Sequence, residues 1–105
     1  MEQNTMFKSR LLLPCSPGKT FYTNKGHVVW SIYELVYNIE NMDEYTFRYH
    51  VNADNNKNDF ADWIRFVLED KELAMALEGI IEKQKYIEII RKRIKEAEDF
   101  ENRNS

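Results

Sequence analysis

The apolar residues that follow Trp30 recur with the period of an α-helix. They stand three or four positions apart, at Ile32, Leu35, Val36 and Ile39, and this spacing places side chains on one face of a helix. Ser31 and Glu34 have the spacing of a capping box, in which two side chains satisfy free backbone N–H groups at a helix start. We therefore expect a helix over about residues 32–40.

A second helical pattern follows a polar, asparagine-rich loop at residues 52–57. Asn58 or Asp59 can cap this helix, and its apolar positions follow the i, i+3, i+4, i+7, i+8 rule. These positions are Phe60, Trp63, Ile64, Val67 and Leu68. Asp70 can cap a third helix, which carries Leu73 and Leu77 on its apolar face.

The tail that starts at Lys71 contains no proline, which leaves two arrangements open. A single helix to about Asp99 would be about 43 Å long, whereas a compact domain of this size is only about 34 Å across. Either the helix breaks at Gly79 and folds back, or its end projects from the domain.

Residues 43–51 fit either a strand or a helix. Alternation favours a strand, with aromatic or apolar residues at positions 45, 47, 49 and 51. Asp43 and Glu44, however, resemble a helix start, and a short connection at Asn41–Met42 suits two antiparallel helices. We favour the helix.

Two β-prone runs, residues 20–23 and 27–30, surround a turn that contains Gly26 and predict a short hairpin. The fold class expected is mainly α, with four to five helices, a short N-terminal β-hairpin and a long C-terminal helix. The expected organisation is an extended N-terminal arm (1–19), a compact helical domain with the hairpin (20–78), a C-terminal helix (79–101) and a disordered tail (102–105). The expected core comprises Ile32, Leu35, Ile39, Phe47, Phe60, Trp63, Ile64, Val67, Leu73 and Leu77.

Composition supports one ordinary globular domain. The chain has 105 residues, of which 43% are hydrophobic, and a net charge of −3, so it has no overall positive field to hold a nucleic acid. Cys15 is the single cysteine, and with two histidines it supplies too few ligands for a zinc site. We predict no metal and no cofactor. The apolar run of three leucines near the N-terminus is too short for a signal peptide or a membrane span, so we expect a cytoplasmic protein without a membrane partner.

The apolar stripe of the C-terminal helix raises the question of what covers it. Five residues share this face: Tyr86, Ile87, Ile90, Ile94 and Ala97. They can pack on the helices of the same chain, or on a partner helix, most simply from a second copy. We take them as a predicted interface, so that aspartate at Ile90 and Ile94 is expected to abolish assembly and leave the N-terminal fold intact.

The segment from Lys83 to Lys95 contains the main basic cluster, formed by Lys83, Lys85, Arg91, Lys92, Arg93 and Lys95. These side chains could contact nucleic-acid phosphates. Acidic residues such as Glu88 alternate with them, however, and a solvated helix face with i, i+4 ion pairs explains the pattern better.

The best candidate for a polar site comprises His50, Asn58, Asp59 and Trp63. An imidazole held by a carboxylate could act as a general base, and closure of the loop between His50 and Asp59 could bring the two together. The favoured alternative is structural: Asn58 and Asp59 cap a helix, His50 binds loop backbone, and Trp63 lies in the core. A metal site at His50, Asp54 and Asp59 lacks any supporting spacing motif.

Three motifs occur in a fixed order along the chain: Phe-x-Tyr-His-Val at residues 47–51, Asn-Asp-Phe-x-x-Trp-Ile at 58–64 and Asp-x-x-Leu-Ala at 70–74, after Phe21, Gly26 and Glu34–Leu35. With this pattern, part of the chain resembles a family of small archaeal and bacterial domains of unknown function. The resemblance covers residues 20–77 and implies a compact, mainly helical module without an assigned reaction. Any site common to the family would fall at His50, Asn58, Asp59 and Trp63.

These observations together favour a non-catalytic protein-interaction or regulatory module. Its expected partner is a second copy of the chain, as a homodimer or higher assembly through the C-terminal helix, or another protein. The alternatives are a nucleic-acid-associated protein that uses the Lys83–Lys95 cluster, and a small enzyme or ligand-binding domain around His50 and Asp59.

Overall fold

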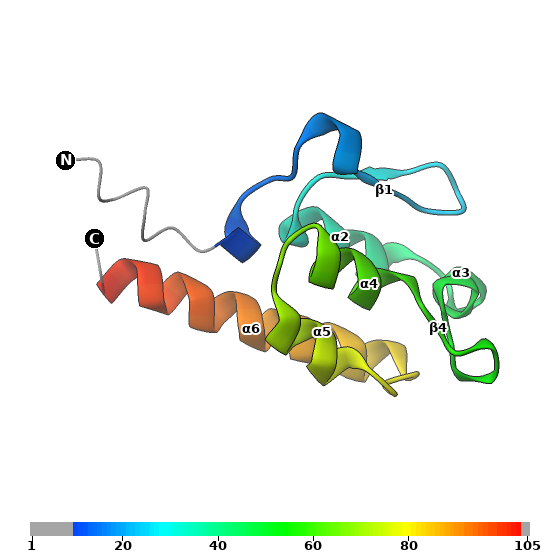
Figure 1. Ribbon diagram of the computed structural model, residues 1–105. Helices are drawn as coiled ribbons and strands as arrows, with labels where there is room; N and C mark the ends of the chain where they lie inside the picture. Colours follow the sequence, from blue (N-terminus) through cyan, green and yellow to red (C-terminus); the bar gives the residue numbers. More distant parts are fainter. Residues whose placement is uncertain (1–9, 104–105) are drawn as a thin grey trace.

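The structure is a computed structural model that describes residues 10–103. Within this range five α-helices pack around one core, and a hairpin lies over α2 and α4 (Figure 1). The elements in chain order are η1 (Arg10–Leu12), η2 (Pro17–Lys19), β1 (Phe21–Tyr22), β2 (Val28–Val29), α2 (Ile32–Asn41), α3 (Glu44–His50), β3 (Val51–Asn52), η3 (Ala53–Asn55), β4 (Lys57–Asn58), α4 (Asp59–Phe66), α5 (Lys71–Leu77) and α6 (Lys83–Arg103). The mainly α prediction is confirmed.

The predicted hairpin is present as β1 and β2. The two strands are antiparallel, with Phe21 opposite Val29. Gly26 has φ of +87°, which an L side chain rarely adopts. The hydroxyl of Thr23 closes the turn, because it accepts hydrogen bonds from the backbone N–H groups of Lys25 and His27.

The start of α2 differs in one detail from a capping box. Ser31 accepts the N–H of Glu34 at 3.3 Å, as the motif requires. The Glu34 carboxylate accepts the N–H of Trp30 at 2.6 Å, one residue before the cap. The two side chains still satisfy two backbone donors, so the helix starts where the pattern predicts.

Residues 44–50 form a helix, as we favoured. Asp43 caps α3 by accepting the N–H of Thr46 at 2.8 Å, and this bond keeps the pKa of Asp43 below its ordinary value. Phe47 is fully buried, while Tyr45 and Tyr49 point outward. The alternation that resembled a strand therefore reflects a helix with one aromatic side chain inside and two outside.

The expected loop at residues 52–57 is instead a second, very short hairpin. Strands β3 and β4 are antiparallel, with Val51 opposite Asn58. The Asn52 side chain accepts the N–H groups of Asp54 and Asn55, and Asn56 turns the chain with φ of +52°. Asparagine tolerates this left-handed conformation better than most residues, which accounts for the asparagine-rich composition.

The tail breaks at Gly79 rather than continuing as one helix. Helix α5 ends at Leu77, and Gly79 has φ of +80°. The chain then folds back, so that α6 runs beside α5 and along α2 (Figure 1). A glycine in the left-handed conformation is a common helix ending.

The prediction that the apolar face of α6 forms an interface is wrong. Tyr86, Ile87, Ile90, Ile94 and Ala97 are only 0–9% exposed and belong to the core of the chain itself. Part of their cover comes from η1, which contacts α6. Because this face is already covered by the same molecule, it is not available to a partner helix.

The predicted organisation also needs two corrections. The arm is not wholly separate from the domain, since Leu11, Leu12 and Cys15 are buried in the common core. Residues 102 and 103 continue α6 instead of forming a disordered tail, while positions 1–9 and 104–105 lie outside the described range. Nine of the ten expected core residues are buried; Val67 is half-buried, and Leu68 fills the core beside it.

Candidate functional site

The His50 ring joins the N-terminal hairpin to α4. It is 3% exposed, and its Nε2 accepts a hydrogen bond from the backbone N–H of Asn24 at 3.1 Å. Its Nδ1 lies 2.9 Å from Asp59 Oδ2. Because Nε2 must present a lone pair to a backbone donor, the network assigns the proton of the neutral ring to Nδ1, which donates to Asp59.

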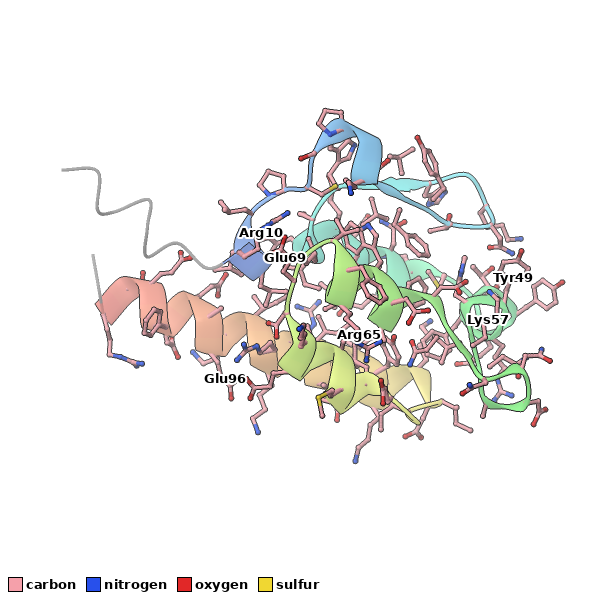
Figure 2. The ribbon with its side chains drawn as sticks, in the orientation of Figure 1. Arg10, Tyr49, Lys57, Arg65, Glu69 and Glu96 are labelled. Atoms are coloured by element: carbon pink, nitrogen blue, oxygen red, sulfur yellow. The ribbon has the colours of Figure 1, made fainter. Side chains whose placement is uncertain are left out.

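The Asp59 carboxylate has two side-chain partners, His50 and Lys57. Besides the imidazole, the same Oδ2 accepts from Lys57 Nζ at 2.5 Å. Lys57 also donates to the backbone carbonyl of Tyr49 at 2.8 Å and lies 4.5 Å from the centre of its ring. Figure 2 shows Tyr49 and Lys57 together at one end of the molecule. This cluster fastens the α3–α4 connection to α3.

Asn58 joins α4 to the C-terminal helices. Its Oδ1 accepts the N–H of Ala61, which caps α4, and the hydroxyl of Tyr86 at 2.5 Å. Its Nδ2 donates to the carbonyl of Leu77 at 3.0 Å. Tyr86 is fully buried, and burial raises the pKa of its hydroxyl far above the ordinary value. The hydroxyl is therefore a neutral donor that fixes α6 to the start of α4.

Trp63 lies one turn further along α4 and faces η2. Its Nε1 donates to the carbonyl of Lys19 at 2.8 Å. The ring of Phe21 connects it to His50, with ring centres 6.1 Å from Trp63 and 5.3 Å from His50. The four candidate residues therefore surround the start of α4, but they face different neighbours and do not converge on one cavity.

This geometry supports the structural alternative rather than general-base catalysis. A general base needs a free lone pair within reach of its substrate, and both nitrogens of His50 already bind the chain. Asn58 and Trp63 likewise use their polar atoms internally. Within residues 10–103, no three His, Cys, Asp or Glu side chains gather in a way that could hold a metal ion. Across the same range, no helix is both long and apolar enough to cross a membrane.

A model of the Family of unknown function (DUF5752) matches residues 21–103, the whole span from β1 to the end of α6. The chain belongs to this family. No curated protein and no solved structure matches it.

The DUF5752 match extends further than the resemblance at residues 20–77, because it includes α6. The structure provides the physical reason. Helix α6 covers the core that the earlier helices build, and Tyr86 binds Asn58 directly. The family unit is therefore the helical domain together with its C-terminal helix.

The basic cluster on α6 is largely paired within the chain. Lys83 donates to the carbonyl of Met42, Arg91 pairs with Glu40, Arg93 pairs with Asp70, and Lys95 lies 3.7 Å from Asp99. Four of the six basic side chains therefore already have anionic or carbonyl partners. This pairing weakens the positive field that α6 could offer to a phosphate backbone.

Two features were missed in the sequence. Asp70 is buried, caps α5 and binds Arg93 on α6; the cap was recognised, but no local signal links positions 70 and 93. The second feature is a cleft between the hairpin turn and the end of α2, lined by Lys25, His27 and Asp43 among others. Lys25 and His27 flank Gly26 and were a sequence signal for this cleft. The opposite wall comes from a separate part of the chain, the end of α2 and the α2–α3 connection.

Replacing His50 with leucine should lower the free energy of unfolding by about 2–3 kcal/mol, because two hydrogen bonds of a buried ring are lost. Urea denaturation measures this loss, and faster amide exchange at Asn24 would locate it in the hairpin turn. His27→Leu is the matched control, since His27 is exposed and its loss should change stability by less than about 1 kcal/mol. Equal stability of both variants would contradict the role given to His50.

Proposed function

We propose that the chain is a non-catalytic protein-interaction module that self-associates through exposed tyrosines of α2 and α3. The observation that carries this proposal is a repeated pattern on consecutive helices. Tyr33 and Tyr37 stand four residues apart on α2, Tyr45 and Tyr49 do so on α3, and all four are between 42% and 72% exposed. We call them the tyrosine pairs. Residues four apart share one helix face, so each helix presents two rings to solvent.

The chemistry of the tyrosine pairs suits a protein interface. Tyrosine is enriched at interfaces because its ring buries a large area while its hydroxyl stays hydrogen-bonded. Tyr33 donates to Glu98 at 2.7 Å, and burial, aided by this bond, raises its pKa to about 12. Tyr49 is held by its contact with Lys57. Rings already held in place lose less entropy on binding.

A second copy of the chain is the partner that these features fit. In a two-fold interface the same residues of both copies meet, so tyrosine rings of one copy can stack on those of the other. The net charge of −3 is too small to drive two copies apart at physiological salt. A cytoplasmic location is part of this proposal, because the one cysteine is a buried free thiol and a reducing compartment leaves such a thiol unchanged.

The double variant Tyr45→Ser/Tyr49→Ser should weaken self-association at least about tenfold, since loss of a central aromatic contact commonly costs more than about 1.4 kcal/mol. Sedimentation over a range of concentrations measures the change. Tyr22→Ser/Phe66→Ser is the matched control, because it removes two exposed rings outside α2 and α3 and should leave assembly unchanged. Circular dichroism should show the same helix content in both variants.

A strictly monomeric wild-type chain at high concentration would contradict self-association. Co-purification from the native host with quantitative mass spectrometry then separates the remaining possibilities. A companion that is lost with the tyrosine variant and retained with the control would identify another protein as the partner. A monomer without such a companion would refute the interaction module altogether.

A further inference from the structure

A cleft lies between the hairpin turn and the C-terminal half of α2. It is open to solvent on one side and has a volume of about 450 Å³, which falls within the range of small-molecule sites. The hairpin contributes Lys25 and His27, α2 contributes Tyr37 and Asn41, and the α2–α3 connection contributes Met42 and Asp43. Side chains from separate parts of the chain therefore converge on one space, in contrast to the residues around His50.

The His27 ring is held in one orientation. Its Nδ1 lies 3.0 Å from Asn38 Oδ1, and the Asn38 amide nitrogen already donates to the carbonyl of Glu34. The oxygen of Asn38 is thus the atom that accepts, so Nδ1 carries the proton. Nε2 has no hydrogen-bond partner within residues 10–103 and is left to interact with a ligand.

The cleft carries charges of both signs. Asp43 stays ionised at neutral pH, because its bond from the Thr46 backbone N–H lowers its pKa, with Lys25 and Lys83 adding to the effect. Lys25 makes no ion pair of its own among the described residues, although its charge favours the Asp43 carboxylate. The hairpin wall is therefore cationic, while the wall at the end of α2 is anionic.

This arrangement selects against ligands of a single charge. An anion attracted by Lys25 is repelled by Asp43, and the reverse holds for a cation. A molecule that carries both charges pairs with both walls at once. Tyr37 and Met42 add an aromatic ring and a thioether, which offer contact to an apolar body.

We propose that this cleft binds a small zwitterion, namely a free α-amino acid with an apolar side chain. Lys25 holds its carboxylate, while Asp43 and the Nε2 lone pair of His27 accept hydrogen bonds from its ammonium group. Tyr37 and Met42 contact its side chain. This inference goes beyond the proposed function and does not depend on it. The two share Tyr37, so the cleft is tested at Lys25 and Asp43, which lie outside the tyrosine pairs.

Titration of the full chain with the twenty amino acids, followed by ¹H–¹⁵N NMR and calorimetry, tests the proposal. At least one apolar amino acid should give saturable shifts at the amides of residues 23–27 and 41–46. Its N-acetyl derivative and its methyl ester should each bind at least about tenfold more weakly, because each lacks one charged group that makes hydrogen bonds. The absence of saturable shifts with every amino acid would overturn the proposal. Blocked derivatives that bind as tightly as the free amino acid would also overturn it.

Two variants assign the binding to the cleft. Lys25→Met removes the cation, and Asp43→Asn removes the anion while keeping a residue that caps α3 equally well. Both should lower affinity at least about tenfold with unchanged thermal unfolding. Lys85→Met/Asp54→Asn makes the same charge changes at sites that do not line the cleft and should bind normally. Normal binding by Lys25→Met and Asp43→Asn would overturn the proposal even if an amino acid binds elsewhere.

Discussion

Ile90→Asp should unfold the whole domain. Ile90 is fully buried at the centre of the α6 stripe, so the variant loses about 2–3 kcal/mol of apolar burial. It must also bury a carboxylate without a partner, which costs several kcal/mol more. The sum approaches or exceeds the roughly 5–15 kcal/mol by which domains of this size are stable. Circular dichroism should therefore show little helix and no cooperative thermal transition.

Ile81→Asp is the matched control, because Ile81 is the same residue type but is 49% exposed between α5 and α6. Its effect should stay within about 0.5 kcal/mol, as for most surface substitutions. A folded Ile90→Asp domain that had lost only self-association would restore the interface first expected for α6. Unfolding of both variants would show that the side chain of Ile81 is also needed for the fold, contrary to its exposure.

Ile90 was predicted to lie at an interface between copies, but it lies in the core of the chain. This difference shows what an apolar stripe on a helix can reveal. The period of apolar residues identifies a face that must be covered, and it is the same whether the cover comes from the chain or from a partner. In the structure, α2, α5 and η1 of the same chain pack against α6 and cover this face. Leu11 and Leu12 occupy an arm that was expected to be extended, and their return to α6 is a long-range contact without a local signal.

Local signals predicted the elements well because their causes are local. The caps at Ser31 and Asp70 and the glycine turn at Gly26 each depend on a few neighbouring residues. The β3–β4 hairpin escaped prediction because Asn52, Lys57 and Asn58 make up most of its two short strands, and these residue types are depleted in strands. Its turn depends on the left-handed conformation of Asn56. The sequence does not show which of several neighbouring asparagines adopts this conformation.

The four candidate residues have specific partners in the structure, but their role could not be read from the chain. His50 and Asp59 do meet, as loop closure suggested. The contact that decides their role is with Asn24, 26 residues earlier, and only the tertiary structure supplies it. With that bond in place, the imidazole stabilises the hairpin and is not free to accept a substrate proton.

The Asp70–Arg93 pair joins the start of α5 to α6. Asp70 accepts the N–H of Leu73 at 3.0 Å as the cap of α5. It also accepts two hydrogen bonds from Arg93, at 2.8 and 3.3 Å. The bond to Asp70 raises the pKa of Arg93 further above its ordinary value, so the guanidinium remains charged. Asp70 is almost wholly buried, which makes its partners necessary.

Asp70→Ala should therefore lower the free energy of unfolding by about 3 kcal/mol. The lost cap contributes about 1 kcal/mol, and the charge-assisted bonds to the partly exposed Arg93 contribute about 2 kcal/mol. For a domain of this size the melting temperature should fall by roughly 10 °C or more. Asp70→Asn is the control that keeps the cap, and it should lose only about half as much.

A double-mutant cycle with Arg93→Met separates the pair from the cap. Arg93→Met leaves the buried carboxylate of Asp70 with the cap bond alone, so it should also destabilise the domain. The double variant Asp70→Ala/Arg93→Met should then lose less than the sum of the single losses, by about 1–2 kcal/mol. Strict additivity in urea denaturation would show that the two side chains do not stabilise each other. In that case contacts other than this pair would hold α6 against α5.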